Sequence, residues 1–163
     1  RGGVFYRQVR VGREGKDFRL FKFRSMASGA DKKGLITVGA KDSRVTRVGY
    51  FLRKYKLDEL PQLLNVVRGE MSLVGPRPEV RKYVDMYTVE QRKVLAVAPG
   101  ITDYASIEYV DENVILGQAN DPDQAYVEQI MPDKIRYNMK YIDNRCLKEY
   151  FKIIFLTMMK IVK

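Results

Sequence analysis

Alternating apolar and polar residues near the start of the chain predict a β-hairpin. The first strand is expected over residues 4–11 and its partner over 17–23, with a turn at 12–15. A polar stretch with several glycines follows over 25–43, and we interpret it as a loop that could close over a substrate. The chain is therefore expected to begin with a small antiparallel sheet.

The second strand of this hairpin carries two cations on one face. Phe21 and Phe23 point to one side, and Lys22 and Arg24 point to the other. Residues that share a face two positions apart lie about 6–7 Å from each other, so Lys22 and Arg24 are close enough to bind one diphosphate. A solvated outer face of a hairpin is the alternative interpretation.

Helical spacing of apolar residues predicts two short helices in the middle of the chain. The first is expected over 47–55, with Thr46 as its N-cap. Its buried side is expected to comprise Val48, Phe51, Leu52 and Tyr55. The second has Asp58 as its N-cap, Pro61 in its first turn and Gly69 at its end. Its apolar face comprises Leu60, Leu63, Leu64 and Val67.

Three further helices are expected towards the C-terminus. They cover residues 78–87, 88–97 and 147–162, and Thr88 with Gln91 forms a capping box for the second. The last helix has a wide apolar face edged by lysines. Such a face suits a helix lying in a membrane interface or one docked on the core, and both interpretations stay open.

These elements predict an α+β fold. We expect a helix-rich single domain spanning residues 1–163, with a small antiparallel β-hairpin and amphipathic surface helices. The length suits one domain with its own core and is short for two. The sequence has no run of 18 apolar residues, the length that marks a helix crossing a bilayer.

Charge and composition narrow the chemistry. Lysines and arginines number 30 against 20 acidic residues, and the net charge of +10 predicts an anionic partner: a nucleic acid, a phosphate substrate or an anionic lipid. The absence of histidine excludes catalytic triads and the usual zinc sites. A single cysteine, Cys146, excludes an internal disulfide. Asp121 and Asp123 superficially resemble a metal-binding pair, but a helix cap before Pro122 explains them more simply.

Two adjacent acids, Asp58 and Glu59, stand at a predicted helix start among cations. The N-terminus of a helix favours anions, so both carboxyl groups are expected to be ionised. An aspartate that is ionised at pH 7 can act as a nucleophile without a general base. Adjacent residues on a helix point about 100° apart, so the two carboxylates should have different roles. The alternative is purely structural: Asp58 caps the helix, and the charge of Glu59 complements the helix dipole.

Three blocks of sequence stand out in order along the chain: FKFRSM at 21–26, LDELPQLLNVVRGEMSLVGPRPE at 57–79 and PGIT at 99–102. Together they resemble the bacterial sugar transferases, the monotopic phosphoglycosyl transferases that load a sugar phosphate onto polyprenyl phosphate. The resemblance covers roughly residues 4–102 well and the C-terminal third loosely.

The resemblance implies an activity. The chain would transfer a sugar 1-phosphate from a UDP-sugar to polyprenyl (undecaprenyl) phosphate and so initiate a bacterial capsule, exopolysaccharide, O-antigen or glycoprotein glycan. Asp58 would attack the β-phosphorus, expel UMP and carry the sugar phosphate as a covalent aspartyl intermediate. Asp58 and Glu59 together would bind Mg²⁺ or Mn²⁺, with Glu59 as a ligand or orienter of the metal.

Four cations are candidates for binding the substrate phosphates: Lys22, Arg24, Arg53 and Arg77. The first two rest on strand geometry and on the resemblance. Arg53 and Arg77 rest on the resemblance alone. The sequence departs from the family pattern at Asp103-Tyr104, where Gly-Trp is expected after the PGIT block.

The resemblance also implies a location at the cytoplasmic face of the bacterial inner membrane. Family members carry a hydrophobic, membrane-embedded segment ahead of the position of Gly3, and this sequence lacks it. The expected partners are a UDP-sugar, polyprenyl phosphate and the membrane surface. A basic nucleic-acid-binding module and a non-catalytic membrane-surface scaffold are the alternatives. Neither accounts for an acid pair among cations, and carboxylates repel a phosphate backbone, so no nucleic acid partner is expected.

Overall fold

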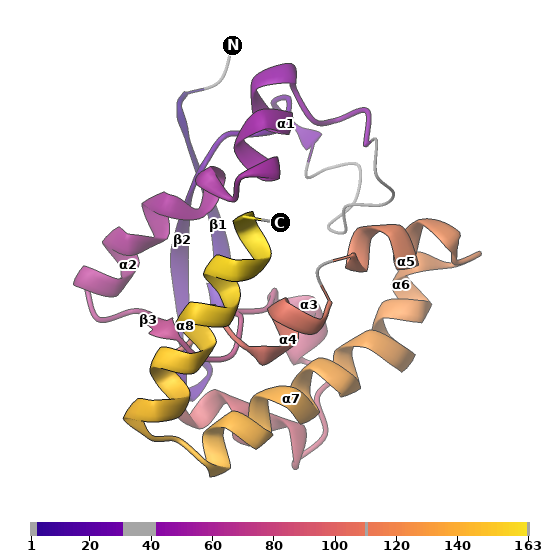
Figure 1. Cartoon of the computed structure of the whole chain (residues 1–163). Helices are drawn as coiled ribbons and strands as arrows, with labels where there is room; N and C mark the ends of the chain where they lie inside the picture. The colour runs from indigo at the N-terminus through magenta and orange to yellow at the C-terminus, as the bar shows by residue number, and fades with distance from the viewer. Residues whose placement is uncertain (1–2, 31–41, 110, 163) are drawn as a thin grey trace.

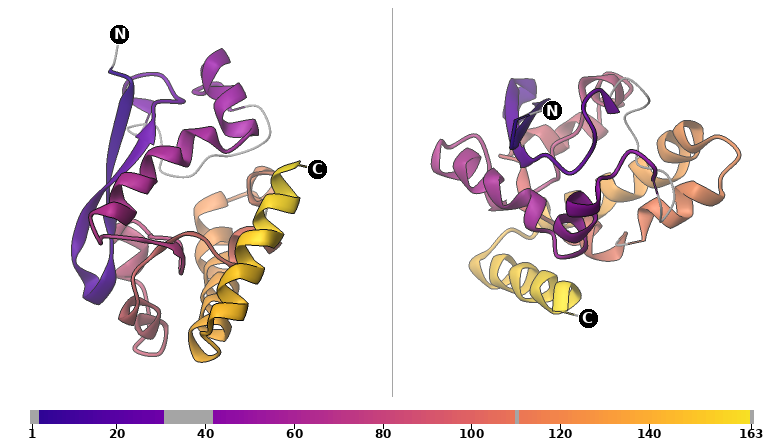
Figure 2. Two further views of the ribbon diagram at one scale, coloured as in Figure 1. Left: turned by 60° about the vertical axis from the view of Figure 1, so that its left-hand side comes forward. Right: turned by 90° about the horizontal axis from the view of Figure 1, so that it is seen from above.

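The computed structural model of the chain describes residues 3–30, 42–109 and 111–162. In Figure 1 the long helix α8 (Leu147–Val162) crosses in front of a β-hairpin, and the other long helix is α7 (Met131–Asp143). Figure 2 shows that the hairpin and these two helices lie on opposite sides of the molecule. The mixture of a small hairpin and many helices confirms the predicted α+β class.

The remaining helices are short. They are the 3-10 helix Arg13–Gly15, α1 (Arg47–Lys54), the 3-10 helix Leu57–Gln62, α2 (Leu63–Val67), α3 (Arg81–Val84), the 3-10 helix Gln91–Ala96, α4 (Tyr104–Glu108), α5 (Glu112–Gln118), α6 (Pro122–Ala125) and the π-helix Tyr126–Ile130. The expected long helices over 78–87 and 88–97 are wrong in extent, although the capping box between Thr88 and Gln91 is confirmed by both of its hydrogen bonds. The middle of the expected loop over 25–43 lies outside the described residues.

The predicted hairpin is confirmed nearly to the residue. Strand β1 (Phe5–Val11) pairs antiparallel with β2 (Asp17–Phe23), with Phe5 opposite Phe23. Phe18 and Leu20 of β2 are buried in one small core cluster with Met71. Lys22 follows Phe18 and Leu20 on the same face of β2, so the packing of this cluster also fixes the direction of the Lys22 side chain.

A second, parallel strand pair was not predicted. Strand β3 (Ser72–Val74) lies beside β4 (Gly100–Thr102), and each has only three residues, too few for a period-2 pattern. The backbones of these two segments approach so closely that a Cβ on Gly100 would lie 2.1 Å from the backbone nitrogen of Gly75. Glycine is therefore required here, and the contact places the Gly75-Pro76-Arg77-Pro78 loop.

The apolar face expected to be buried on α1 is instead largely exposed. The N-cap Thr46 is confirmed, since its Oγ1 accepts from the Gly49 N–H at 2.9 Å. However, Val48 and Phe51 are exposed, and the buried residue of α1 is Gly49, on which a Cβ would lie 1.8 Å from the Ser25 carbonyl oxygen. Close backbone packing at Gly49 thus decides which side of α1 faces inward.

The central segment also turns its apolar face outward. The exposed side carries the whole predicted apolar face: Leu60, Leu63, Leu64 and Val67. The buried residues are Asp58, Pro61 and Gln62 of the 3-10 helix and Asn65 of α2. The predicted cap is wrong as well: Lys56, in a left-handed conformation with φ 55°, precedes the helix, and Asp58 lies inside it.

Asn65 explains why a polar side faces inward. Its Oδ1 accepts from the backbone N–H of Phe21 at 3.0 Å, and its Nδ2 donates to the Arg19 carbonyl at 2.9 Å and to Glu70 at 2.7 Å. The side chain thereby satisfies the free backbone groups of β2, which would otherwise be buried without partners. A polar residue is needed at this position, and it sets the orientation of the whole segment.

Helix α8 has the predicted bounds and is docked on the core, which is one of its two expected placements. Ile153 is fully buried against Val74, Ile107 and Tyr141 of the core. The opposite side is exposed over Leu147, Phe151, Phe155, Met158, Met159 and Ile161. The helix therefore docks on the core and also presents an apolar surface. None of the described helices combines the length and apolar character needed to cross a bilayer.

Candidate active site

A cavity of about 360 Å³ opens between the hairpin, the 3-10 helix Leu57–Gln62, the loop around Arg77 and the helices α4, α5 and α7. It brings together five of the six residues predicted as site residues: Lys22, Arg53, Asp58, Glu59 and Arg77. A smaller cavity of about 150 Å³ adjoins it, and Lys22, Arg53 and Asp58 line both. These residues come from separate elements that only the fold brings together.

Glu59 binds two of the cations. Its Oε1 accepts from Lys22 Nζ at 3.2 Å and from Arg77 Nη2, and its Oε2 accepts from Arg77 Nη1 at 3.1 Å. All three side chains are largely shielded from solvent. The ion pairs tie the hairpin, the 3-10 helix and the Arg77 loop to one another.

These contacts shift the pKa values of the three groups. Burial opposes ionisation of Glu59, but Arg77 and Lys22 outweigh it and hold the pKa of Glu59 well below its usual range. Glu59 in turn raises the pKa of Arg77. Burial lowers the pKa of Lys22 to about 8, although Glu59 acts in the opposite direction. Lys22 is therefore a cation that begins to lose its proton just above neutral pH.

Asp58 is left without a direct partner. It is only 7% exposed and lines both cavities, yet no hydrogen bond or ion pair to its carboxylate occurs within the described residues. Burial raises the pKa of Asp58, and the charge of Glu59 adds to this effect, while Lys22 and Arg53 oppose it. Burial thus opposes the ionisation of Asp58, whereas the neighbouring cations favour the ionisation of Glu59. A buried, unpaired carboxylate facing a cavity is poised to interact with a ligand.

The predicted phosphate-binding cations differ in where their side chains point. Arg53 donates through Nε to Ser25 Oγ at 2.9 Å and lines both cavities. Arg24 instead donates to the carbonyl oxygens of Gly3 and Phe5 at 2.7 and 3.2 Å, and it lines only the smaller cavity. Lys22 and Arg24 therefore share only the smaller cavity, and the Arg24 side chain is bound there by backbone carbonyl groups.

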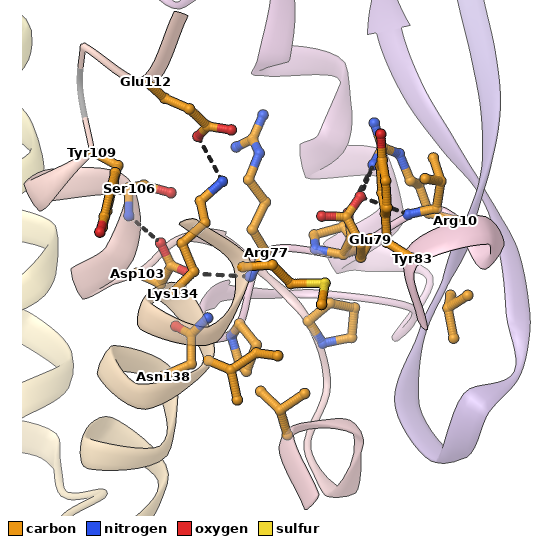
Figure 3. A pocket seen from close by; sticks show the side chains of 18 of the residues that line it. Arg10, Arg77, Glu79, Tyr83, Asp103, Ser106, Tyr109, Glu112, Lys134 and Asn138 are labelled. Carbon is orange, nitrogen blue, oxygen red and sulfur yellow. Dashed lines mark hydrogen bonds and ion pairs between the residues drawn. The ribbon is translucent and has the colours of Figure 1, made fainter. Parts of the chain in front are cut away.

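Asp103 holds the loop that carries Arg77. One carboxylate oxygen accepts from the backbone N–H of Arg77 at 3.1 Å, and the other accepts from the backbone N–H of Ser106 at 2.6 Å, which caps α4 (Figure 3). Asp103 is fully buried. The departure from the family pattern at Asp103-Tyr104 is thus accommodated by an acid that fixes the position of Arg77.

The sequence did not reveal a group of polar residues on the far side of the cavity, which we call the polar lobe: Ser106, Glu112, Asn113, Lys134 and Asn138. Figure 3 shows Arg77 between the Glu112–Lys134 pair and the Arg10–Glu79 pair. Glu112 and Lys134 form an ion pair at 2.6 Å. They come from α5 and α7, which no motif linked to the acid pair.

Asp58 fits a role as a metal ligand better than Glu59 does. Mg²⁺ is usually held by one or two carboxylates together with substrate phosphates, and the Asp58 carboxylate is unpaired. Both oxygens of Glu59 already accept from cations, so the predicted binding of a metal by Glu59 is not favoured. Asp123 is also engaged, by Lys82 and Tyr83, and Asp121 caps α6 as expected. The described residues contain no group of three potential protein ligands for a metal.

Comparison with known proteins identifies relatives of the whole chain. The profile of the family described as bacterial sugar transferase matches residues 1–163. A UDP-N-acetylgalactosamine-undecaprenyl-phosphate N-acetylgalactosaminephosphotransferase of Aeromonas hydrophila is 39% identical over 99% of this chain and 36% of its own length. A UDP-glucose:undecaprenyl-phosphate glucose-1-phosphate transferase of Klebsiella pneumoniae is 39% identical over 98% of this chain and 33% of its own length. The chain thus spans about a third of these two relatives.

A shorter relative is matched over most of its length. The uncharacterized sugar transferase EpsL of Bacillus subtilis is 38% identical over 98% of this chain and 70% of its own length. A sequence similar to this chain therefore makes up most of a smaller relative, whereas it makes up only about a third of the longer ones.

The contrast between the two acids predicts opposite effects on stability. At pH 7, Glu59→Gln should lower the free energy of unfolding by roughly 3 kcal/mol, because breaking a buried ion pair leaves Lys22 and Arg77 uncompensated. Asp58→Asn should leave it unchanged or raise it, since that change removes an unpaired buried charge. Urea unfolding of both variants measures this difference.

The effect of Glu59→Gln should also depend on pH. The pKa of Glu59 is lowered in the folded state, so its stabilisation is fully present above its ordinary pKa of 4.5 and is lost as the pH falls through the lower folded value. The deficit of the variant should therefore shrink on acidification. Equal stability of the variant and the unmodified protein at pH 7 would contradict this account.

Proposed function

The chain belongs to the bacterial sugar transferase family, and on that premise we propose that it transfers a sugar 1-phosphate from a UDP-sugar to undecaprenyl phosphate. This reaction would initiate assembly of a bacterial glycoconjugate. The observation that carries the proposal is Asp58, a buried and unpaired carboxylate that faces a cavity close to Lys22, Arg53 and Arg77. The names of the relatives indicate the substrate classes. The cavity contains the carboxylate and the cations that the reaction would need.

The reaction would proceed in two displacements at phosphorus. A carboxylate oxygen of Asp58 attacks the β-phosphorus of the UDP-sugar, and the bond from that phosphorus to the bridging oxygen breaks. UMP leaves with the electron pair, and Asp58 carries the sugar phosphate as an acyl phosphate. A phosphate oxygen of the lipid then attacks the same phosphorus and releases the Asp58 carboxylate. Both nucleophiles are anions, so neither step needs a base, which suits a chain without histidine.

The cations of the site have distinct roles in this proposal. Lys22, Arg53 and Arg77 reduce the repulsion between the Asp58 carboxylate and the negative diphosphate. Glu59 is a positioning residue, because it fixes the side chains of Lys22 and Arg77. A Mg²⁺ or Mn²⁺ ion held by Asp58 and the substrate phosphates would supply further charge neutralisation.

We also propose that the chain works at a membrane surface, the cytoplasmic face of the bacterial inner membrane. Apolar side chains are exposed on α1, on the Leu57–Val67 segment and on α8. Monomeric proteins rarely expose many large apolar residues on neighbouring helices without a partner. Lysines on α8 and the net charge of +10 would add attraction to anionic lipids.

Release of UMP tests the proposed activity. With undecaprenyl phosphate, the unmodified chain should release UMP from at least one member of a panel of UDP-sugars, and chelation by EDTA should stop the release. Asp58→Asn should reduce turnover by roughly a thousandfold or more, because it removes the nucleophile. Asp85→Asn, at an exposed aspartate outside the cavity, is the matched control.

Two outcomes would contradict the proposal. Appreciable turnover by Asp58→Asn would exclude Asp58 as the nucleophile. No release of UMP from any UDP-sugar, together with nucleic-acid binding that weakens steeply with salt, would support the alternative of a nucleic-acid-binding module.

Sedimentation with vesicles tests the membrane proposal. Phe51→Glu on α1 and Phe151→Glu on α8 should each reduce co-sedimentation with phosphatidylglycerol vesicles, because each places a charge in the apolar surface. Val89→Glu makes the same change at an exposed apolar residue outside these helices and should have little effect. Binding that is indifferent to Phe51→Glu and Phe151→Glu would reject contact of these helices with lipid.

A further inference from the structure

The polar lobe is a part of the cavity that the proposed phosphoryl transfer does not use. Arg77 links it to the rest of the site, because Arg77 pairs with Glu59 and Glu59 pairs with Lys22. Glu112 is close enough to Arg77 to contribute to its raised pKa, so the polar lobe begins directly beside the phosphate-binding cations. Figure 3 shows Lys134, Asp103 and Asn138 grouped on this side.

The ion pair in the polar lobe offers a donor and an acceptor side by side. Lys134 Nζ lies 2.6 Å from Glu112 Oε2, and both side chains are mostly shielded, with exposures of 15% and 24%. The Lys134 ammonium also lies 5.2 Å from the centre of the Tyr126 ring, which fixes it in place. An ammonium and a carboxylate held together can donate to one ligand hydroxyl and accept from its neighbour.

Asn138 adds an acceptor that has no partner. It lies one helical turn after Lys134 on the same face of α7 and lines the cavity at 5% exposure. Its Oδ1 has no hydrogen-bond partner within the described residues. Buried polar atoms are almost always paired in folded proteins, so a buried, unpaired acceptor on a residue that lines the cavity favours a ligand that donates to it.

The chemistry of the polar lobe excludes a phosphate as its ligand. The Glu112 carboxylate and the Asn138 carbonyl oxygen would both face the negative oxygens of a phosphate, and Lys134 is already paired. A neutral ligand with several hydroxyl groups, or with an amide N–H, matches the set of two acceptors and one donor. Within a UDP-sugar, the transferred sugar has this character.

We propose that the polar lobe binds the transferred sugar and that Glu112, Lys134 and Asn138 determine which sugar is accepted. The inference rests on the proposed function, since it assigns a part of the UDP-sugar to the same cavity. The ribose and uracil of the donor also carry hydroxyl and imide groups, and a purely structural ion pair is the remaining alternative. The experiment must therefore separate binding of the sugar from binding of the nucleotide.

Calorimetric binding of UDP and of four UDP-sugars makes this separation. The ligands are UDP-glucose, UDP-galactose and their two 2-acetamido counterparts, measured with the unmodified chain and with Lys134→Met and Asn138→Leu. In both variants, the ratio between the tightest and weakest UDP-sugar should fall at least tenfold, while the affinity for UDP changes less than twofold. The values of kcat/KM for UMP release should show the same loss of discrimination.

Two controls exclude an effect of lysine removal in general and an effect of lost stability. Lys93→Met removes a lysine from an exposed ion pair with Glu90 outside the cavity, and it should leave the ratios unchanged. Thermal unfolding should show that Asn138→Leu is at least as stable as the unmodified chain, because it replaces an unpaired acceptor with an apolar side chain. A loss of discrimination in that variant would then come from the missing acceptor.

The outcomes distinguish this inference from the proposed function. A parallel fall in affinity for UDP and for every UDP-sugar would assign the polar lobe to the nucleotide and overturn the inference. Unchanged ratios in both variants, or no discrimination by the unmodified chain, would also overturn it. Discrimination in binding that depends on Lys134 and Asn138 without any release of UMP would support the inference while rejecting the proposed transferase activity.

Discussion

The ion pairs of Glu59 with Lys22 and Arg77 are the constraint on which the site depends. They join three parts of the chain that are remote in sequence, and they occupy both oxygens of Glu59. Asp58, the adjacent residue on the same 3-10 helix, faces the cavity without a partner. One acid therefore organises the cations while its neighbour stays available for chemistry, which is the division of roles that helical geometry requires of adjacent residues.

The orientation of the central segment follows from this constraint. A helix that directs Asp58, Glu59 and Asn65 towards the hairpin must direct Leu60 and Leu63 away from it. The cost of exposing apolar side chains is offset if they contact lipid, and the proposed transfer to a lipid phosphate would take place at that surface. One short segment would thus contribute both to a buried polar site and to a surface that faces the membrane.

Sequence reasoning succeeded where the signal was local. The hairpin, the cap at Thr46 and the bounds of α8 follow from neighbouring residues. A helical period does not say which face is buried, so the buried side of α1 was predicted wrongly. The contacts of Gly49 and Asn65 decide which sides of α1 and α2 face inward. The larger cavity brings together all of the predicted site residues except Arg24, which lines the adjoining smaller cavity. The polar lobe could not be predicted, because it depends on how α5 and α7 pack across the cavity.

The central claim is that Asp58 acts as a covalent nucleophile, and intact-mass spectrometry tests it most directly. Incubation with a reactive UDP-sugar in the absence of lipid should make the chain heavier by one phosphosugar, with up to one UMP released per site. Hydroxylamine should remove the added mass, because acyl phosphates are activated, and Asp58→Asn should gain none. The absence of any adduct on a sample that turns over when undecaprenyl phosphate is present would contradict the two-step mechanism and indicate a direct displacement.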